Sequence, residues 1–174
     1  MSVGVRVPTP LNDAVQQYEP GSAGRDRLAD WLAKSPLGQA LPMTIGGEKR
    51  LGGGTEVSVV EPYNRHSLLW FIREAAQEDT ADAVQAALSS SAAWRDMDFV
   101  DRAAVFLKAA DLLAGPWRER VVAATMLGQS KTATQAELDA SCELIDFFRF
   151  NVKFAEQICD AQPSCRSAAH TCSM

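Results

Sequence analysis

The sequence has no run of roughly eighteen consecutive apolar residues, the minimum for a membrane-spanning helix. It also has no excess of positive charge, because 17 Lys and Arg stand against 22 Asp and Glu, giving a net charge of −5. Nucleic-acid-binding domains normally present a basic face. We therefore expect neither a membrane nor a nucleic acid as a partner.

The N-terminus lacks the apolar segment of a secretion signal. It is also poor in arginine, since Arg6 is the only one in residues 1–24, where Asp13 and Glu19 add negative charge. Mitochondrial transit peptides are rich in Arg and contain few acidic residues. The N-terminal sequence therefore indicates neither secretion nor mitochondrial import.

No cysteine occurs before residue 142, and the four present are Cys142, Cys159, Cys165 and Cys172. Without a secretion signal, reduced thiols are expected rather than a disulfide framework. The last three and His170 are separated by five, four and one residues. Compact zinc sites do not use this spacing, so we expect no metal site.

No phosphate-binding motif is complete. In the stretch around Gly128–Thr132, Thr125 and Ser130 occupy the two glycine positions of a P-loop. We interpret this stretch as a helix break with Gly128 as the C-cap. The three glycines at 52–54 cannot complete a dinucleotide-binding fingerprint, and we interpret them as a hairpin turn.

What is present is typical of one globular domain, with 47% hydrophobic and 22% charged residues. Residues 1–21 predict an extended arm, and Ser22 is expected to cap a helix that runs to about Lys34. A loop is predicted at 35–42 and short strands at 43–50, 55–63 and 67–74. The apolar run Leu68–Ile72 predicts burial on both faces of the last strand.

Four helices are predicted after the strands. Thr80 is the expected N-cap of the first, Asp98 caps the second, and Pro116 begins the third. The fourth has an apolar stripe at helical spacing, made of Ala140, Leu144, Phe147, Phe148, Phe154, Ala155 and Ile158. The expected fold class is therefore α+β and mainly α: an arm, a small β-sheet and about four helices.

Three titratable residues on or near these elements need an assignment. Cys142 precedes the acidic Glu143, whose charge raises rather than lowers a thiol pKa, so we expect an inert, small hydrophobic residue. His66 is expected in a solvated turn. Glu143 lies at the edge of the apolar stripe of the fourth helix, as a solvated flank or as a polar group in a pocket wall.

The sequence TMLGQSKT (125–132) is followed by QAELDASCELIDFFRFN (135–151) and preceded by DRAAVFLKAADLLAGPWRERVVAA (101–124). This run resembles the aldehyde dehydrogenase superfamily. More narrowly, it is similar to the L-glutamate-γ-semialdehyde dehydrogenases, also called Δ1-pyrroline-5-carboxylate dehydrogenases. The resemblance covers roughly residues 5–163 and concerns the N-terminal portion of a family whose members are several times longer.

The resemblance implies three regions. Residues 1–40 would form the N-terminal arm and short helix, and residues 41–163 a partial aldehyde dehydrogenase domain of strands followed by helices. Residues 164–174 would be an unrelated, disordered tail. The chain is then expected to be a truncated N-terminal part of the aldehyde dehydrogenase α/β fold.

The resemblance also implies a reaction for the parent enzyme, the NAD-dependent oxidation of glutamate semialdehyde to glutamate in proline catabolism. The family uses a cysteine nucleophile, a general-base glutamate, an oxyanion-stabilising asparagine and a Rossmann-type sheet that binds NAD. None of these is expected in this chain. We therefore predict no catalytic residue, no bound cofactor and no activity for the chain alone.

By the same resemblance, Glu143 approaches the substrate channel, where a carboxylate would meet the ammonium group of the amino-acid aldehyde. A structural carboxylate that binds a neighbouring loop is the alternative. The second functional hypothesis is a freestanding helical module that self-associates or pairs with full-length subunits. The family implies a cytoplasmic location in bacteria and the mitochondrial matrix in eukaryotes.

Overall fold

The computed structural model describes residues 6–35 and 37–161. The elements confirm the expected fold class, a mainly helical chain with a few strands. They are α1 (Ala23–Lys34), β1 (Gln39–Ala40), β2 (Met43–Ile45), β3 (Glu48–Arg50), β4 (Glu56–Glu61), β5 (Asn64–Arg73), α2 (Gln77–Asp96), α3 (Phe99–Ala114), α4 (Arg118–Gln129), α5 (Ala133–Ala136), the π-helical turn η1 (Glu137–Cys142) and α6 (Glu143–Asp160).

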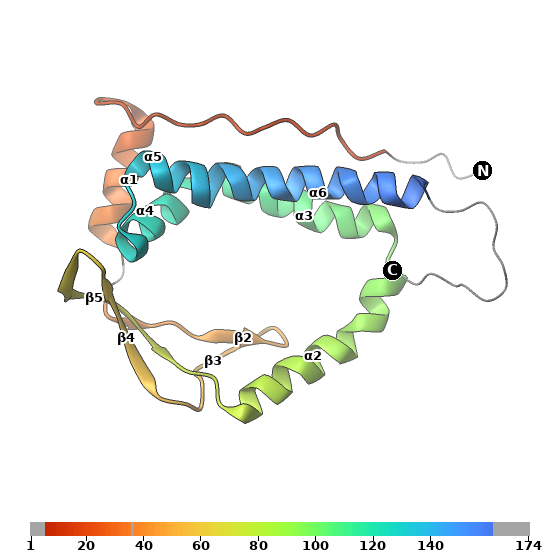
Figure 1. Cartoon of the computed structure of the whole chain (residues 1–174), viewed down its shortest axis with the longest axis horizontal. Helices are drawn as coiled ribbons and strands as arrows, with labels where there is room; N and C mark the ends of the chain where they lie inside the picture. The colour runs from red at the N-terminus through yellow and green to blue at the C-terminus, as the bar shows by residue number, and fades with distance from the viewer. Residues whose placement is uncertain (1–5, 36, 162–174) are drawn as a thin grey trace.

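The elements are arranged in a ring (Figure 1). Helices α6 and α3 form an upper layer, α1 and α4 close one end, and the strands and α2 form the lower side. The extended arm, residues 6–21, runs antiparallel along α6. An ion pair of 2.5 Å joins Arg6 to Asp160 at one end, and Tyr18 contacts Glu137 at the other.

The predicted first helix is confirmed as α1. The hydroxyl of Ser22 accepts a hydrogen bond from the backbone N–H of Arg25 at 3.2 Å, which satisfies a donor that the first helical turn leaves free. Leu28 is buried and packs with Val122 and Ala123 of α4. The contact between α1 and α4 forms one of the two hydrophobic clusters among the described residues.

The strands depart from the prediction in two places. Residues 43–50 form the hairpin β2–β3, which turns at Gly46 and Gly47 with φ of 59° and 86°. The predicted loop at 35–42 contains β1, which pairs in parallel with β5. A three-stranded sheet of order β1-β5-β4 results, with β4 antiparallel to β5.

The three glycines at 52–54 do not form the predicted hairpin turn. They pass close to the backbone of Glu74, whose carbonyl oxygen accepts the Gly54 N–H at 2.9 Å. A Cβ on Gly52 would lie 2.2 Å from that oxygen, and the Gly53 N–H donates to the Asp79 carboxylate at 2.8 Å. Glycine is needed here for close backbone approach and not for a turn.

Strand β5 begins at Asn64, before its predicted start, so the exposed His66 lies in a strand and not in a turn. The prediction that Leu68–Ile72 is buried on both faces is wrong. Leu69 alone in that run is fully buried, and its neighbours are half-buried. The reason is sparse coverage, because among the described residues α4 is the helix that packs against this sheet, through β4.

Helix ends also differ from the predictions. Helix α2 begins at Gln77, and the carboxylate of Asp79 accepts the Ala76 N–H at 2.8 Å, so the predicted cap Thr80 already lies within the helix. Helix α3 ends before Gly115 as predicted. After α4 the left-handed residue is Ser130, with φ of 56°, and not Gly128.

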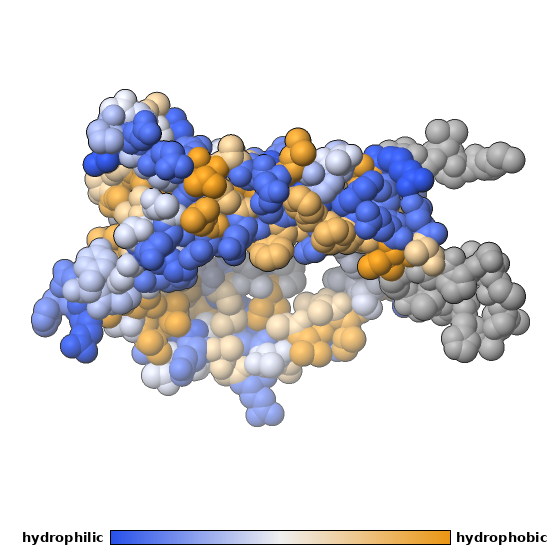
Figure 2. Space-filling model, turned by 45° about the horizontal axis from the view of Figure 1, so that its top comes forward, coloured by the Kyte–Doolittle hydropathy of each residue, from blue (hydrophilic) through white to orange (hydrophobic). Residues whose placement is uncertain are grey.

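The fourth predicted helix begins earlier than Ala140. Helix α5, the π-turn η1 and α6 follow one another without a break from Ala133 to Asp160. Ile145 and Val152 are the hydrophobic residues that α6 buries, whereas Phe147 and Phe154 of the predicted stripe are 58% and 49% exposed. Figure 2 shows apolar side chains open at the surface, interleaved with polar ones.

No helix of the described residues is long and apolar enough to cross a membrane. The predicted tail at 164–174 lies outside the described residues, together with Cys165, His170 and Cys172. The boundaries proposed for the three regions therefore stay predictions.

The close approach at Gly52 yields a stability prediction. Gly52→Ala should lower the free energy of unfolding by about 1–3 kcal/mol, because the new methyl group meets a backbone carbonyl that cannot move independently. Gly128→Ala is the matched control, since nothing lies within 4 Å of its Cβ position in α4. It should be neutral or stabilise by up to about 1 kcal/mol. Urea unfolding of both variants measures the difference, and equal effects would contradict the assignment.

Candidate functional site

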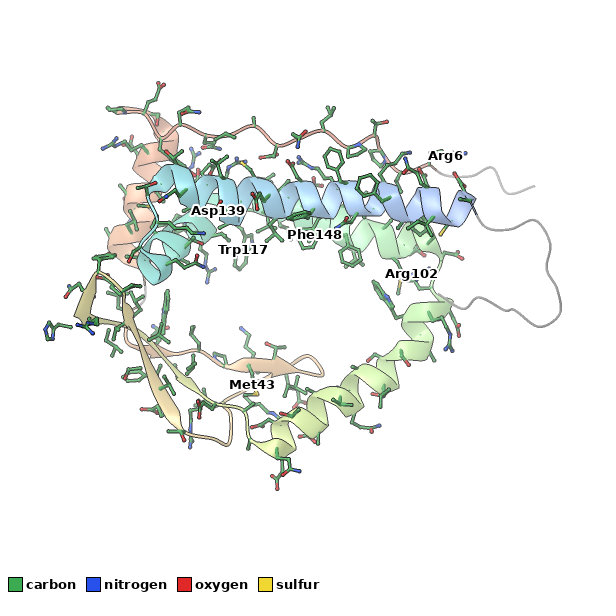
Figure 3. All side chains as sticks on the ribbon, in the orientation of Figure 1. Arg6, Met43, Arg102, Trp117, Asp139 and Phe148 are labelled. Carbon is green, nitrogen blue, oxygen red and sulfur yellow. The ribbon has the colours of Figure 1, made fainter. Side chains whose placement is uncertain are left out.

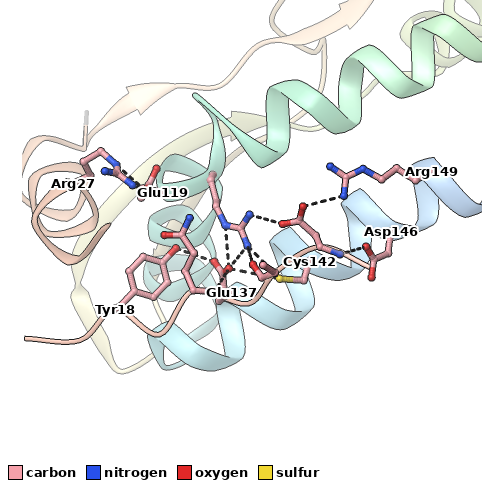
Figure 4. A network of polar contacts seen from close by, with 11 residues as sticks. Tyr18, Arg27, Glu119, Glu137, Cys142, Asp146 and Arg149 are labelled. Atoms are coloured by element: carbon pink, nitrogen blue, oxygen red, sulfur yellow. Dashed lines mark hydrogen bonds and ion pairs between the residues drawn. The ribbon is translucent and has the colours of Figure 1, made fainter. Parts of the chain in front are cut away.

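Charged side chains are buried where the arm, α4 and η1 meet (Figure 4). Arg118 and Glu137 are 4% and 0% exposed and form an ion pair, with Arg118 Nε 3.0 Å from Glu137 Oε1. Arg118 also donates to the Asp13 carboxylate at 2.5 Å and to the Ala14 carbonyl at 2.7 Å. One guanidinium on α4 therefore binds the arm and the π-turn together.

Glu137 receives hydrogen bonds from the arm as well. The Gln16 N–H donates to it at 2.9 Å and the Tyr18 hydroxyl at 2.8 Å. Burial raises the pKa of the Glu137 carboxyl, but the hydrogen bonds from Arg118, Gln16 and Tyr18 outweigh burial and hold its pKa below the ordinary value. The buried carboxylate is therefore ionised at neutral pH.

Further pairs extend this cluster along the arm and α6. The Asp13 carboxylate accepts from Arg149 at 2.9 Å, and the Asp13 N–H donates to Asp146 at 2.7 Å. Near the arm's N-terminus, the Val7 N–H donates to the Glu156 carboxylate at 2.8 Å. The prediction of an arm with little structure of its own is correct for its backbone, but α6 holds that backbone in place.

Cys142 lies at the end of the π-turn and belongs to the same cluster. Its sulfur is 3.5 Å from a Glu137 carboxylate oxygen and 3.4 Å from an Arg118 nitrogen. Burial, followed by the charge of Glu137, raises the pKa of the Cys142 thiol to about 11. The thiol is therefore protonated at neutral pH, and the charge responsible is that of Glu137 and not that of Glu143.

Glu143 is the first residue of α6 and is exposed in this chain. At 100° per residue, Phe147 and Phe154 project from the same side of α6, opposite the buried Ile145 and Val152. Glu143 thus begins a stripe of exposed aromatic residues. The sequence-based placement of Glu143 beside large apolar side chains agrees with this geometry.

A cavity of about 390 Å³ lies between α3, α6 and Trp94. Phe148 (Figure 3) and Phe106 both line this cavity, and their ring centroids are 5.9 Å apart. Polar groups enter the lining through Arg102 and Asn151. Of the exposed residues on the Glu143 side of α6, Ile158 lines this cavity, whereas Glu143, Phe147 and Phe154 do not.

The remaining candidate motifs have structural roles. Lys131 forms an ion pair of 2.7 Å with Asp139, and Thr132 caps α5 by accepting the Gln135 N–H at 3.3 Å. The predicted helix break is therefore confirmed at residues 130–132, but Gly128 as its C-cap is wrong, because Gly128 lies within α4. Among the described residues, no three His, Cys, Asp or Glu side chains gather in a way that would bind a metal ion.

Sequence reasoning missed the buried cluster. The partners of Arg118 are distant in the sequence: Glu137 is 19 residues away and Asp13 is 105 residues away. No local pattern in the sequence marks Glu137 as buried, because its partners lie in the arm and in α4. A charge in such a position must be paired, since an unpaired buried charge is strongly unfavourable.

The chain belongs to the aldehyde dehydrogenase family, whose sequence profile matches residues 50–173. Within that family it is similar to proteins named Δ1-pyrroline-5-carboxylate dehydrogenase. The mitochondrial protein of that name from Dictyostelium discoideum is 42% identical over 164 residues, and the human mitochondrial protein is 40% identical over 154.

Solved structures agree. The crystal structure of the Mycobacterium tuberculosis Δ-pyrroline-5-carboxylate dehydrogenase matches 95% of this chain with a TM-score of 0.91 and 50% identity. That enzyme has also been solved with NAD bound. The present chain covers 31% of the mycobacterial chain and 29% of the Dictyostelium protein. It therefore spans less than a third of the length of these relatives.

The lowered pKa of Glu137 predicts how the stability of the fold changes at low pH. Its carboxylate stabilises the fold fully above the unfolded-state pKa near 4.5, and this contribution is lost as the pH falls below that value towards the lowered folded-state pKa. Glu137→Gln should cost about 3 kcal/mol at neutral pH, because it leaves Arg118 incompletely paired. It should also flatten the loss of stability below pH 4.5.

Asp139→Asn is the control, because Asp139 lies in the same π-turn but forms an exposed pair with Lys131. Its effect should stay below about 1 kcal/mol. Urea unfolding at a series of pH values compares the three proteins. An unchanged acid dependence in Glu137→Gln would show that other carboxylates control acid unfolding.

Proposed function

We propose that this chain is the N-terminal portion of an enzyme that oxidises L-glutamate γ-semialdehyde to glutamate. In that reaction the aldehyde and water react with NAD to give the carboxylate, NADH and two protons. The observation that carries the proposal is the match in sequence and backbone to Δ1-pyrroline-5-carboxylate dehydrogenase, at 50% identity and a TM-score of 0.91.

Glu143 is the residue of this chain that we assign to substrate binding. An exposed carboxylate next to Phe147 suits an amino-acid aldehyde, whose ammonium group needs an anion while its carbon chain packs against apolar side chains. A hydrogen bond between charged groups contributes about 1.5–3 kcal/mol. Glu143 would bind and orient the substrate and would take no part in bond breaking.

We expect NAD to bind to another part of the enzyme. Gly52 and Gly54 lie against the Glu74 backbone and the Gly53 N–H donates to Asp79, so these groups occupy the space that a phosphate would need. The thiol of Cys142 is buried and protonated, and therefore no nucleophile. We assign the nucleophile, the general base and the cofactor site to the part of the enzyme that this chain does not span, and we expect the free chain to be inactive.

The same relatives suggest a location. The names of the Dictyostelium and human proteins include the word mitochondrial. We propose the mitochondrial matrix if the chain comes from a eukaryote and the cytoplasm if it comes from a bacterium.

A second function, a helical module that pairs with itself or with full-length subunits, is favoured by one observation. Phe147, Phe154 and Ile158 are 58%, 49% and 54% exposed on one side of α6. Large apolar side chains in such a stripe normally mark a contact surface. Co-purification with an intact dehydrogenase would favour this role over that of a segment of one enzyme.

The substrate role of Glu143 is tested in a chimera in which this chain replaces the matching segment of the mycobacterial enzyme. Glu143→Gln should raise KM for glutamate semialdehyde about ten- to a hundredfold, because the charged hydrogen bond is lost. KM for glutaric semialdehyde, which has no ammonium group, should stay unchanged. Steady-state rates of NADH formation with both aldehydes measure this.

The free chain, assayed with the same aldehydes and NAD, is the companion sample. It should form no NADH above a heat-killed control, and titration calorimetry with NAD should give no heat of binding. Turnover by the free chain would contradict the assignment of the catalytic groups to the remainder of the enzyme. A Glu143→Gln variant that changes thermal stability but neither KM would make Glu143 a structural residue.

The exposed side chains of Phe147, Phe154 and Ile158 on α6 predict that the free chain self-associates. Each large apolar side chain left in water forfeits roughly 1.5–3 kcal/mol, so the free chain should self-associate in sedimentation experiments. Phe154→Ser should weaken that association, whereas Glu56→Ser on the exposed edge of β4 should not. A clean monomer with a sharp, cooperative thermal transition would contradict this expectation.

A further inference from the structure

The π-helical turn η1 stands directly before Glu143. The Glu143 N–H donates to the Leu138 carbonyl, five residues back, and not to the carbonyl four residues back. One extra residue in a helical turn rotates the following helix by about 100° relative to the preceding one. The direction in which Glu143 projects from the fold is therefore set by this turn.

The buried cluster holds the two ends of the turn. Glu137 is the first residue of η1 and Cys142 the last, and both side chains contact the same Arg118 guanidinium. In a regular α-helix, positions five residues apart point roughly 140° away from each other. Both side chains can therefore reach one guanidinium, and lie 3.5 Å apart, because the backbone between them is π-helical.

The turn has a local cost. The Ser141 side chain is fully buried, and its hydroxyl has no hydrogen-bond partner among the described residues. A buried polar group without a partner costs about 1–3 kcal/mol. A geometry that carries such a cost persists when surrounding contacts determine it, and the contacts here are those of Arg118 and Glu137.

We propose that Arg118 and Glu137 are positioning residues that hold the π-turn and so aim Glu143 at the ammonium group of the substrate. The cluster then sets the preference for an amino-acid semialdehyde over an aldehyde without the amino group. This inference rests on the substrate role assigned to Glu143 above.

The arm also helps to hold the π-turn. Gln16 and Tyr18 donate two of the hydrogen bonds that Glu137 accepts, so the arm helps to hold the first residue of the turn. Tyr18→Phe removes one of these bonds without removing a charge or changing the shape of the ring. It should therefore loosen the turn slightly while the fold stays intact.

The test uses the chimera described above with three variants. Glu137→Gln should lower the ratio of kcat/KM for glutamate semialdehyde to that for glutaric semialdehyde by about tenfold or more, mainly through KM of the amino substrate. Tyr18→Phe should lower it by a smaller factor. Asp139→Asn, in the same turn but exposed, should leave it unchanged.

If the buried cluster only stabilises the fold, a different result is expected. Glu137→Gln and Tyr18→Phe would then lower the thermal midpoint and reduce kcat/KM for both aldehydes equally, and that outcome would overturn the inference. If Glu137→Gln does not fold, an unchanged ratio in Tyr18→Phe overturns it equally.

Glu143→Gln separates this inference from the proposed function. If Glu143→Gln leaves the ratio unchanged, the substrate role of Glu143 is wrong and the positioning role falls with it. If Glu143→Gln lowers the ratio but Glu137→Gln and Tyr18→Phe do not, the substrate role stands and the positioning role alone is overturned.

Discussion

The buried ion pair between Arg118 and Glu137 is the interaction on which the upper half of the structure depends. It joins α4 to η1, and through Asp13, Gln16 and Tyr18 it holds the arm against both. A buried pair adds little net stability compared with a well-packed apolar substitute, but removal of one partner is strongly unfavourable. The pair thus selects one arrangement of three segments that are distant in sequence.

Helix α2 and the strands have no comparable buried ion pair among the described residues, and they are packed less closely. Helix α2 has few contacts with the other described elements, and the sheet is half-covered. The two hydrophobic clusters of the described residues lie around Val122, where α1 meets α4, and around Val152, where the arm and α3 meet α6. The strands and the start of α2 therefore depend on strand pairing and on individual hydrogen bonds, such as those of Asp79 with Gly53 and Ala76.

The sequence correctly predicted those features of the fold that depend on interactions between residues close together in the chain. The cap at Ser22, the stop at Gly115 and the existence of four main helices after the strands all follow from interactions within a few residues. Strand β1 and the passage of Gly52 past Glu74 depend on partners about 20 to 30 residues away. Periodicity carries no information on such partners, so both were missed.

The apolar stripe predicted for the fourth helix consists mainly of exposed residues and omits the two hydrophobic residues that α6 buries. Ile145 and Val152 are buried among the described residues, whereas Phe147 and Phe154 project from the opposite side. A helix with apolar residues on two faces needs two partners, and here the first is the arm with α3. The π-turn sets the phase of the helix, and therefore decides which face meets the arm and which face, with Glu143, stays exposed in this chain.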